Sequence, residues 1–186
     1  GKSVTEPTLR KTLAIGADRA FRIDSVPFDG FFVAKQISEF LKSNNYDLII
    51  AGRESIDHNG AMVPGMIAAL NNINFVTNCV KLEIDETNAT AEREIDGGKE
   101  VLSCKLPLVI GGQKGLVEES DLRIPNMRGI MQARQKPLSV IPAFECEIKT
   151  NSIKYRKPKP REKVKLVSSE NLDQLIDLLH NEAKVL

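Results

Sequence analysis

The sequence lacks several features that would point directly to a function. Its 26 basic and 25 acidic residues leave a formal charge of +1, so the field of the whole chain cannot attract nucleic acid or an anionic membrane. Its apolar runs, such as residues 48–51, are far too short to span a bilayer, and the first residues, GKSVTEPTLRK, lack the apolar stretch of a secretory signal. We therefore expect no nucleic-acid partner and no membrane insertion.

Cysteine and histidine are scarce as well. Cys79, Cys104 and Cys146 are odd in number, widely spaced and without a Cys-x-x-Cys pair, which indicates buried thiols in a reducing compartment rather than a disulfide framework. The only two histidines, His58 and His180, have no Cys or His at ligand spacing, so no metal site is expected. The expected location is the cytoplasm, or the mitochondrial matrix if the source is eukaryotic.

What the sequence does contain is an α/β pattern in its first half. Its 186 residues, 41% of them apolar, are enough for one ordinary core. The expected elements are a helix over residues 5–15, a strand over 20–23, a helix over 29–41, a strand in DLIIAG (47–52) and a helix over 62–70. The continuous apolar run in DLIIAG is typical of a strand buried on both faces. This order predicts a doubly wound, mostly parallel sheet with helices on both faces.

Because the chain begins on a helix of such a layer, the pattern predicts that a strand precedes it and that the sequence is N-terminally incomplete. The pattern then changes after residue 74. Strands are expected over residues 75–83, 89–95 and 100–110, with Asp96, Gly97 and Gly98 in a tight turn, which forms an antiparallel hairpin excursion. A helix over 124–134 and a strand over 137–141 complete the first unit.

The C-terminal segment has a different composition. Residues 154–165 hold seven Lys or Arg, one acid, Glu162, and two prolines, which favours an extended arm. With a single aromatic residue, Tyr155, the arm is better suited to clasping a protein partner than to binding nucleic acid. A helix behind a Ser cap follows, with Leu172, Leu175, Ile176, Leu179 and Ala183 on one face. We expect two parts: an α/β nucleotide-binding unit (1–150) and the basic arm with its helix (151–186).

The segment AGRESIDHNGAMVPG runs from the end of the DLIIAG strand into a helix. Ligands of open α/β sheets lie at this end of the strands, where free N–H groups and the helix dipole favour a phosphate. Gly52 and Gly60 allow close backbone approach, Arg53 adds positive charge, and Asp57 offers an acceptor to a ribose hydroxyl. An ordinary strand-to-helix connection is an equally good interpretation of the same residues, since neither a GxGxxG nor a P-loop pattern is present.

Other candidate sites are weaker. Ser55, Asp57 and His58 lie within four residues, but one short loop without a nucleophile elbow does not supply the geometry of a catalytic triad. Leu116 and Val117 stand between a glycine-rich loop and three acids. Such apolar residues are either incidental or a docking anchor for another protein, and composition does not choose between the two.

Four stretches carry a family resemblance: LRKTLAIGADRAFRI, AGRESIDHNGAMVPGMIAAL, EREIDGGKEVLSCKLPLVIGG and LVEESDLRIPNMRGIMQARQKP. The tail, PREKVKLV with a helix ending in EAKVL, belongs with them. Together, in this order and over essentially the whole chain, they resemble the β subunit of electron transfer flavoprotein. That family normally begins with further strands and helices, which agrees with the expected missing strand.

The resemblance implies a heterodimer with an FAD-carrying α subunit. The dimer takes electrons from flavoprotein dehydrogenases, such as the acyl-CoA dehydrogenases of fatty acid oxidation, and passes them to a quinone oxidoreductase. The β subunit performs no substrate chemistry and holds AMP as a structural nucleotide. The family's AMP segment corresponds here to Gly52, Arg53, Glu54, Ser55, Ile56, Asp57, His58, Asn59, Gly60, Ala61, Met62 and Val63. Its docking leucine corresponds to Leu116, beside Val117, and an acid near the flavin corresponds to Glu83.

The loop departs from the family pattern in part. Where relatives often have two further acids after the aspartate, and then Gln before Thr or Val, this chain has His58, Asn59 and Met62, followed by Val63. Two alternatives stay open: an electron-bifurcating β subunit with a second FAD in place of AMP and with NADH oxidation, and a nucleotide-binding sensor of the universal-stress type that needs no flavoprotein partner.

Overall fold

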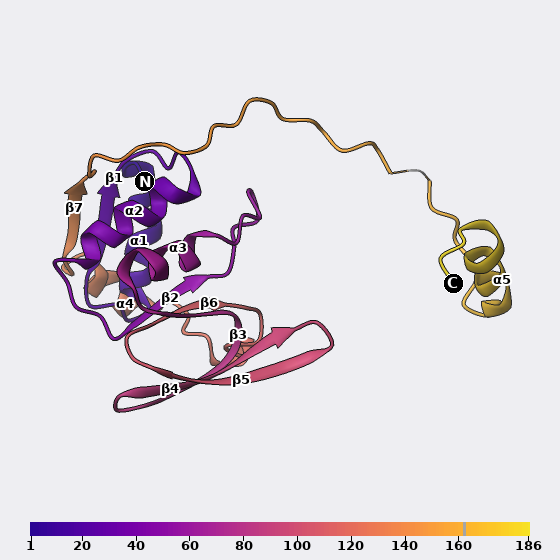
Figure 1. The fold of residues 1–186 in the computed structure, drawn as a ribbon, viewed down its shortest axis with the longest axis horizontal. Coiled ribbons are helices and arrows are strands. Elements are labelled where there is room, and N and C mark those ends of the chain that lie inside the picture. Colours follow the sequence, from indigo (N-terminus) through magenta and orange to yellow (C-terminus); the bar gives the residue numbers. More distant parts are fainter. Residues whose placement is uncertain (162) are drawn as a thin grey trace. The chain divides into compact units, whose positions relative to one another are not determined.

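A computed structural model describes residues 1–161 and 163–186 (Figure 1). The chain divides into two compact units, Gly1–Asn151 and Ser152–Leu186, which we describe separately. The expected arm contains Glu162, which lies outside the described residues. In the described part of the chain, no helix is both long enough and apolar enough to cross a membrane.

The first unit is built from seven strands and several helices. In chain order they are η1 (Ser3–Thr5), α1 (Glu6–Ala14), β1 (Ala20–Asp24), α2 (Gly30–Leu41), β2 (Leu48–Gly52), α3 (Val63–Asn71), β3 (Asn74–Asp85), β4 (Asn88–Ile95), β5 (Gly98–Lys105), β6 (Leu108–Gly112), η2 (Glu119–Asp121), α4 (Met127–Ala133) and β7 (Leu138–Pro142). The expected α/β fold is confirmed.

The strands form two hydrogen-bonded sheets. β1 and β7 pair in parallel, and the second sheet has the order β2-β6-β3-β4-β5. In that second sheet β2, β6 and β3 are parallel, whereas β3, β4 and β5 form the expected antiparallel excursion. The long strand β3 serves both parts, and its pairing with β4 shifts register at a bulge between Cys79 and Lys81.

Helices cover both faces of the β1–β7 sheet. Successive strand residues point to opposite faces. Ala20 accordingly packs with Leu13 of α1 and Ala133 of α4, while Phe21 lies 4.9 Å from the Phe40 ring of α2. On the second sheet, α2 and α3 pack against β2 and β6, where Ala34, Ile67, Ala68 and Val109 form a buried cluster. Helix α2 therefore contacts both sheets.

Two expectations about strands were wrong. Residues 100–110 form two strands, because Pro107 has no N–H for a ladder and the chain changes from antiparallel pairing with β4 to parallel pairing with β2 and β3. The run in DLIIAG is not buried on both faces: Ile50 is 61% exposed. The reason is that, among the described residues, β2 pairs only with β6 and stands at a sheet edge.

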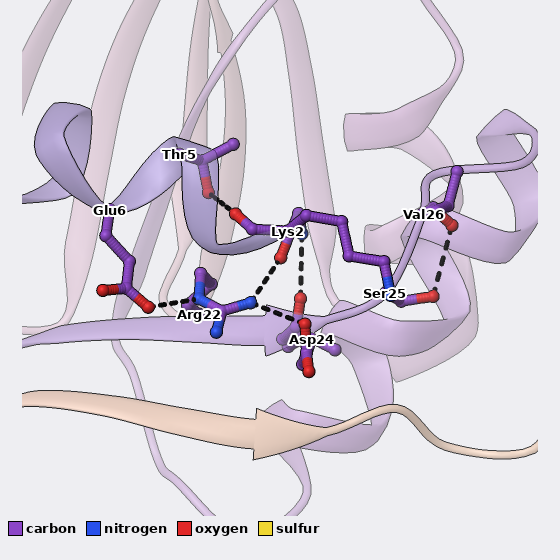
Figure 2. Close-up of polar contacts among 9 residues, drawn as sticks. Lys2, Thr5, Glu6, Arg22, Asp24, Ser25 and Val26 are labelled. Carbon is purple, nitrogen blue, oxygen red and sulfur yellow. Dashed lines mark hydrogen bonds and ion pairs between the residues drawn. The ribbon is translucent and has the colours of Figure 1, made fainter.

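Arg22 ties the start of the chain to β1. Its side chain is only 7% exposed, and its Nε donates to Glu6 Oε1 at 3.0 Å. Its Nη1 donates to Asp24 Oδ1 and to the carbonyl oxygen of Gly1, both at 2.7 Å (Figure 2). These contacts fix the first turn of α1 over the carboxyl end of β1.

Helices α1 and α4 cap each other. Arg10 of α1 donates to the carbonyls of Ala133 and Lys136 at the end of α4, at 2.7 and 2.8 Å. Lys136 in turn donates from Nζ to the carbonyls of Leu13 and Ala17 at the end of α1, at 3.1 and 2.7 Å. Each cation thus binds one carbonyl in the last turn of the other helix, at the negative end of its dipole, and one carbonyl in the segment just beyond it.

The described residues of the second unit include one short helix. α5 (Leu172–Asp177) continues into a π-helical turn, η3 (Leu178–Glu182). The expected Ser cap is wrong, because Asn171 supplies it: its Oδ1 accepts from the backbone N–H of Gln174. Residues 152–161 and 163–167 have neither helix nor strand, and Lys165 pairs with Glu182. Leu172 and Ile176 of α5 are exposed.

Candidate functional site

The loop from Gly52 to Val63 lies where the sequence predicts a ligand site. It leaves the carboxyl end of β2 and enters the N-terminus of α3. The backbone N–H of Arg53 donates to the carbonyl of Gly112 at 3.1 Å, so the loop starts between the carboxyl ends of β2 and β6. This is the edge of a parallel sheet at which α/β folds bind ligands.

The backbone of this loop turns sharply. The N–H of Asn59 donates to the carbonyl of Ser55 at 2.8 Å. Positive φ angles occur at Asn59 (46°) and Ala61 (49°), on either side of Gly60. Asn tolerates this region, but Ala does so only at a cost. Ala61 is therefore held in a strained conformation by its surroundings.

Both glycines of the loop have room for a side chain at ordinary van der Waals distance. A Cβ atom added to Gly52 would meet only the carbonyl of Glu54, at 3.9 Å, and one added to Gly60 would have Met62 Cε at 3.5 Å as its nearest neighbour. Neither backbone position is covered by a close protein neighbour. The Met62 side chain also reaches α2: a Cβ on Gly30 would lie 2.6 Å from its sulfur, so Met62 packs on the first turn of that helix.

The charged side chains of the loop are largely paired within it. Arg53 forms an ion pair with Glu54. A hydrogen bond from the Ser55 hydroxyl, with further backbone hydrogen bonds, lowers the pKa of Asp57 below its usual value. His58 Nε2 lies 3.9 Å from the same carboxylate. Serine and histidine thus both face Asp57, which is not the order of a nucleophile, base and orienting acid.

The loop is mostly exposed. Residues 54–62 are exposed, and Ile56 reaches 96%. In the described part of the chain, no group of three His, Cys, Asp or Glu side chains could hold a metal ion. What the loop offers is backbone groups, two glycines and the N-terminus of α3, which suits a polar ligand held without bond chemistry.

The expected docking residues have different environments. Leu116 is partly buried and packs against the cluster that includes Cys79 and Ile110. A Cβ on Gly112 would lie 3.3 Å from its Cδ2. Val117 is 55% exposed. Leu116 therefore anchors its own loop, and Val117 is the more exposed of the two side chains.

An exposed apolar group beyond this loop did not emerge from the sequence. Leu122, Ile124 and Met127 are all more than half exposed. The sequence pattern favoured a helix from residue 124, which would bury one side of such a run, but α4 begins only at Met127, where Asn126 caps it. Pro125 lies outside the helix, as its missing N–H and its restriction on the preceding residue favour.

Glu83 lies on β3, in the antiparallel part of the sheet. Its side chain is exposed and pairs with Lys81 Nζ at 2.8 Å, and that hydrogen bond lowers the pKa of Glu83. Its register partner on β4 is Thr90, which is also exposed. Glu83 is thus on the solvent-facing side of this hairpin and is not part of the Gly52–Val63 loop.

The fold defines the chain as an α/β protein whose Gly52–Val63 loop lies at the carboxyl ends of parallel strands, where α/β proteins bind ligands. Comparisons with known proteins give its family. The family model for the electron transfer flavoprotein domain matches residues 1–145. The chain is 33% identical over 200 residues to electron transfer flavoprotein subunit beta of Bacillus subtilis (strain 168), covering 100% of the chain and 77% of that relative. The chain belongs to the electron transfer flavoprotein family.

Two further relatives give the same result. The mitochondrial electron transfer flavoprotein subunit beta of Oryza sativa subsp. indica is 33% identical over 195 residues, with 100% of this chain and 75% of the relative covered. The corresponding subunit of Bradyrhizobium diazoefficiens is 27% identical over 189 residues, with the same coverage. The matched relatives are β subunits, and electron transfer is the role that the family supports.

Proposed function

We propose that this chain is the β half of an electron carrier that binds an FAD-bearing α subunit. The carrier accepts electrons from flavoprotein dehydrogenases of the acyl-CoA dehydrogenase type and passes them to a quinone-linked acceptor. The observation that carries this proposal is the match of residues 1–145 to the electron transfer flavoprotein domain, together with full-length similarity to β subunits. The chain itself performs no substrate chemistry.

The Gly52–Val63 loop holds AMP in this proposal. The support is its place at the carboxyl ends of β2 and β6, the open backbone at Gly52 and Gly60, and the helix N-terminus that follows. These features recognise a phosphate and a sugar through main-chain groups, so the loss of family side chains at His58 and Met62 does not remove them. A second FAD in the same place is the competing occupant.

The loop around Leu116 and Val117 docks the electron donor. Leu116 packs on the core and shapes the loop, while Val117 offers an exposed apolar contact. The basic arm and α5 clasp the α subunit, because an apolar helical face on a Pro-rich basic tether is a poor independent unit. The carrier works in the cytoplasm, or in the mitochondrial matrix in a eukaryote; the rice relative is named as mitochondrial.

One experiment tests the core of this proposal. The full chain is co-expressed with a candidate α subunit, the complex is purified, and its absorbance spectrum and extracted nucleotides are measured. We expect a yellow heterodimer that releases one FAD and one AMP. Two FAD and no AMP would favour the bifurcating type instead. A colourless chain that gains nothing from co-expression would contradict the proposal. Adenine nucleotide bound to that chain alone would favour the sensor.

A further inference from the structure

Asp29 joins two segments that lie far apart in the sequence. It is the residue before α2, and its Oδ1 accepts from the backbone N–H of Phe32 at 2.6 Å, which caps the helix. Its Oδ2 accepts from the backbone N–H groups of Lys149 and Thr150, both at 2.7 Å, and from the Thr150 hydroxyl at 3.4 Å. One carboxylate therefore binds the first turn of α2 and the arm root, by which we mean Lys149 and Thr150.

Helix α2 holds the same stretch of chain at a second point. Gln36, only 3% exposed, donates from Nε2 to the carbonyl of Phe144 at 2.7 Å and accepts from the N–H of Phe144 at 2.8 Å. Lys149 Nζ also lies 5.5 Å from the centre of the Phe31 ring. The stretch from Phe144 to Thr150 thus lies along α2, and Asp29 is its last fixed point before the second unit begins at Ser152.

The charge of Asp29 strengthens this attachment. Desolvation raises the pKa of the carboxyl, but hydrogen bonds from the N–H groups of Phe32, Thr150 and Lys149 outweigh it, so the pKa lies below its usual value. The carboxylate is ionised at neutral pH and makes charge-assisted hydrogen bonds at the positive end of the helix dipole. A neutral side chain of similar size would not do the same.

The first turn of α2 also contacts the candidate nucleotide loop. Met62, near the end of that loop, packs on Gly30, the residue next to Asp29. The nucleotide loop and the arm root therefore rest on neighbouring residues. The first turn of α2 therefore supports both the loop that we propose binds a nucleotide and the arm root that leads to the proposed partner-binding arm.

We propose that Asp29 is a positioning residue for partner binding: by holding the arm root on α2, it fixes the point from which the basic arm leaves the α/β unit. The inference rests on the proposed function, because it takes the α subunit as the partner of the arm. A fixed root raises the effective concentration of the arm at the partner surface and lowers the entropy lost on binding.

Asp29→Ser separates the two tasks of this side chain. Serine is a preferred N-cap, so its hydroxyl keeps the bond to the N–H of Phe32, but it is too short to offer a second oxygen to the arm root. Asp29→Ala removes both contacts. Asn126→Ala is the matched control, because it removes the cap of α4, where Asn126 Oδ1 accepts from the N–H of Gly129 at 2.8 Å, and leaves the arm root untouched.

Two measurements on the full chain test the inference. Amide hydrogen exchange in Asp29→Ser should become about tenfold faster at Lys149 and Thr150, with Phe32 unchanged, because charge-assisted hydrogen bonds are lost only at the arm root. The affinity of the folded variant for the α subunit should fall by about tenfold as a result. Asn126→Ala should change neither the exchange at the arm root nor this affinity.

The outcomes separate the inference from the function on which it rests. Unchanged exchange at Lys149 and Thr150 in Asp29→Ser would overturn the attachment. Faster exchange with an unchanged affinity for the α subunit would overturn the positioning role. If the wild-type chain does not bind the α subunit, the proposed function fails and the positioning role fails with it, while the exchange data still decide whether Asp29 holds the arm root.

Discussion

At the scale of single residues, Gly129 shows how closely two helices of this fold approach. A Cβ at this position would clash with the backbone carbonyl of Ala14 on α1. We predict that Gly129→Ala lowers the free energy of unfolding by about 1–3 kcal/mol, because overpacking outweighs the better helix propensity of alanine. Urea unfolding of the full chain measures it.

Gly98→Ala is the control for this prediction. Nothing lies within 4 Å of a Cβ at Gly98, so the substitution should stay within about 0.5 kcal/mol of the wild type. If both variants lost the same stability, the close approach of α1 and α4 would not require glycine at position 129.

The cluster around Arg22 predicts a pH dependence of stability. A hydrogen bond from Arg22 lowers the pKa of Asp24 below its ordinary value of 3.8. A depressed folded pKa stabilises the protein above the unfolded pKa, and this contribution is lost as the pH falls through the folded pKa. Below about pH 4, the melting temperature should fall more steeply in the wild type than in Asp24→Asn. Parallel melting curves would contradict this role of Asp24.

Leu116 and Val117 are expected to behave differently. Leu116→Ala removes a side chain that packs on the core, so it should lower stability by about 1–2 kcal/mol as well as slow electron acceptance. Val117→Ala removes an exposed contact, so it should slow acceptance without changing stability or flavin content. Unfolding curves and stopped-flow reduction by a donor dehydrogenase measure both effects. Normal rates in both variants would exclude docking at this loop.

At the scale of elements, the reciprocal caps of α1 and α4 give the next prediction. Arg10→Met and Lys136→Met each free two carbonyls, one in the last turn of the other helix and one just beyond it, so each should cost about 1–2 kcal/mol of stability. Lys105 is exposed, so Lys105→Met serves as a control and should leave the stability nearly unchanged. Thermal or urea unfolding gives the three values. A neutral Arg10→Met would show that the carbonyls it frees are satisfied by water.

Most elements could be predicted because their signals are local. Apolar periodicity and cap residues predicted the helices near α1, α2 and α3 and the strand positions of β1 and β2. Errors occurred where pairing decides the outcome. Residues 100–110 become two strands only because β5 and β6 have different neighbours, and Ile50 is exposed only because β2 stands at a sheet edge. Neither fact is encoded in a short window of sequence.

At the scale of the whole molecule, local features could again be predicted from the sequence, whereas long-range contacts could not. The Gly52–Val63 loop could be predicted because the strand, loop and helix that form it are consecutive. The attachment of Thr150 to Asp29 could not, since the two residues are 121 positions apart and a single Asp before a helix predicts only a cap. Long-range contacts of this kind need the folded structure.

The last prediction concerns the charge of the arm. Lys157, Lys159 and Arg161 lie in the exposed part of the second unit and have no ion pair among the described residues. If the arm clasps an acidic surface of the α subunit, reversing all three to Glu should weaken association by more than about tenfold and reduce its dependence on salt, because attraction between exposed charges is screened by ions.

The same reversal at Lys11, Lys105 and Lys114 changes the net charge equally on the first unit. That control should bind within about twofold of the wild type. Binding measured at several salt concentrations would contradict a local role of the arm if both triple variants weakened alike.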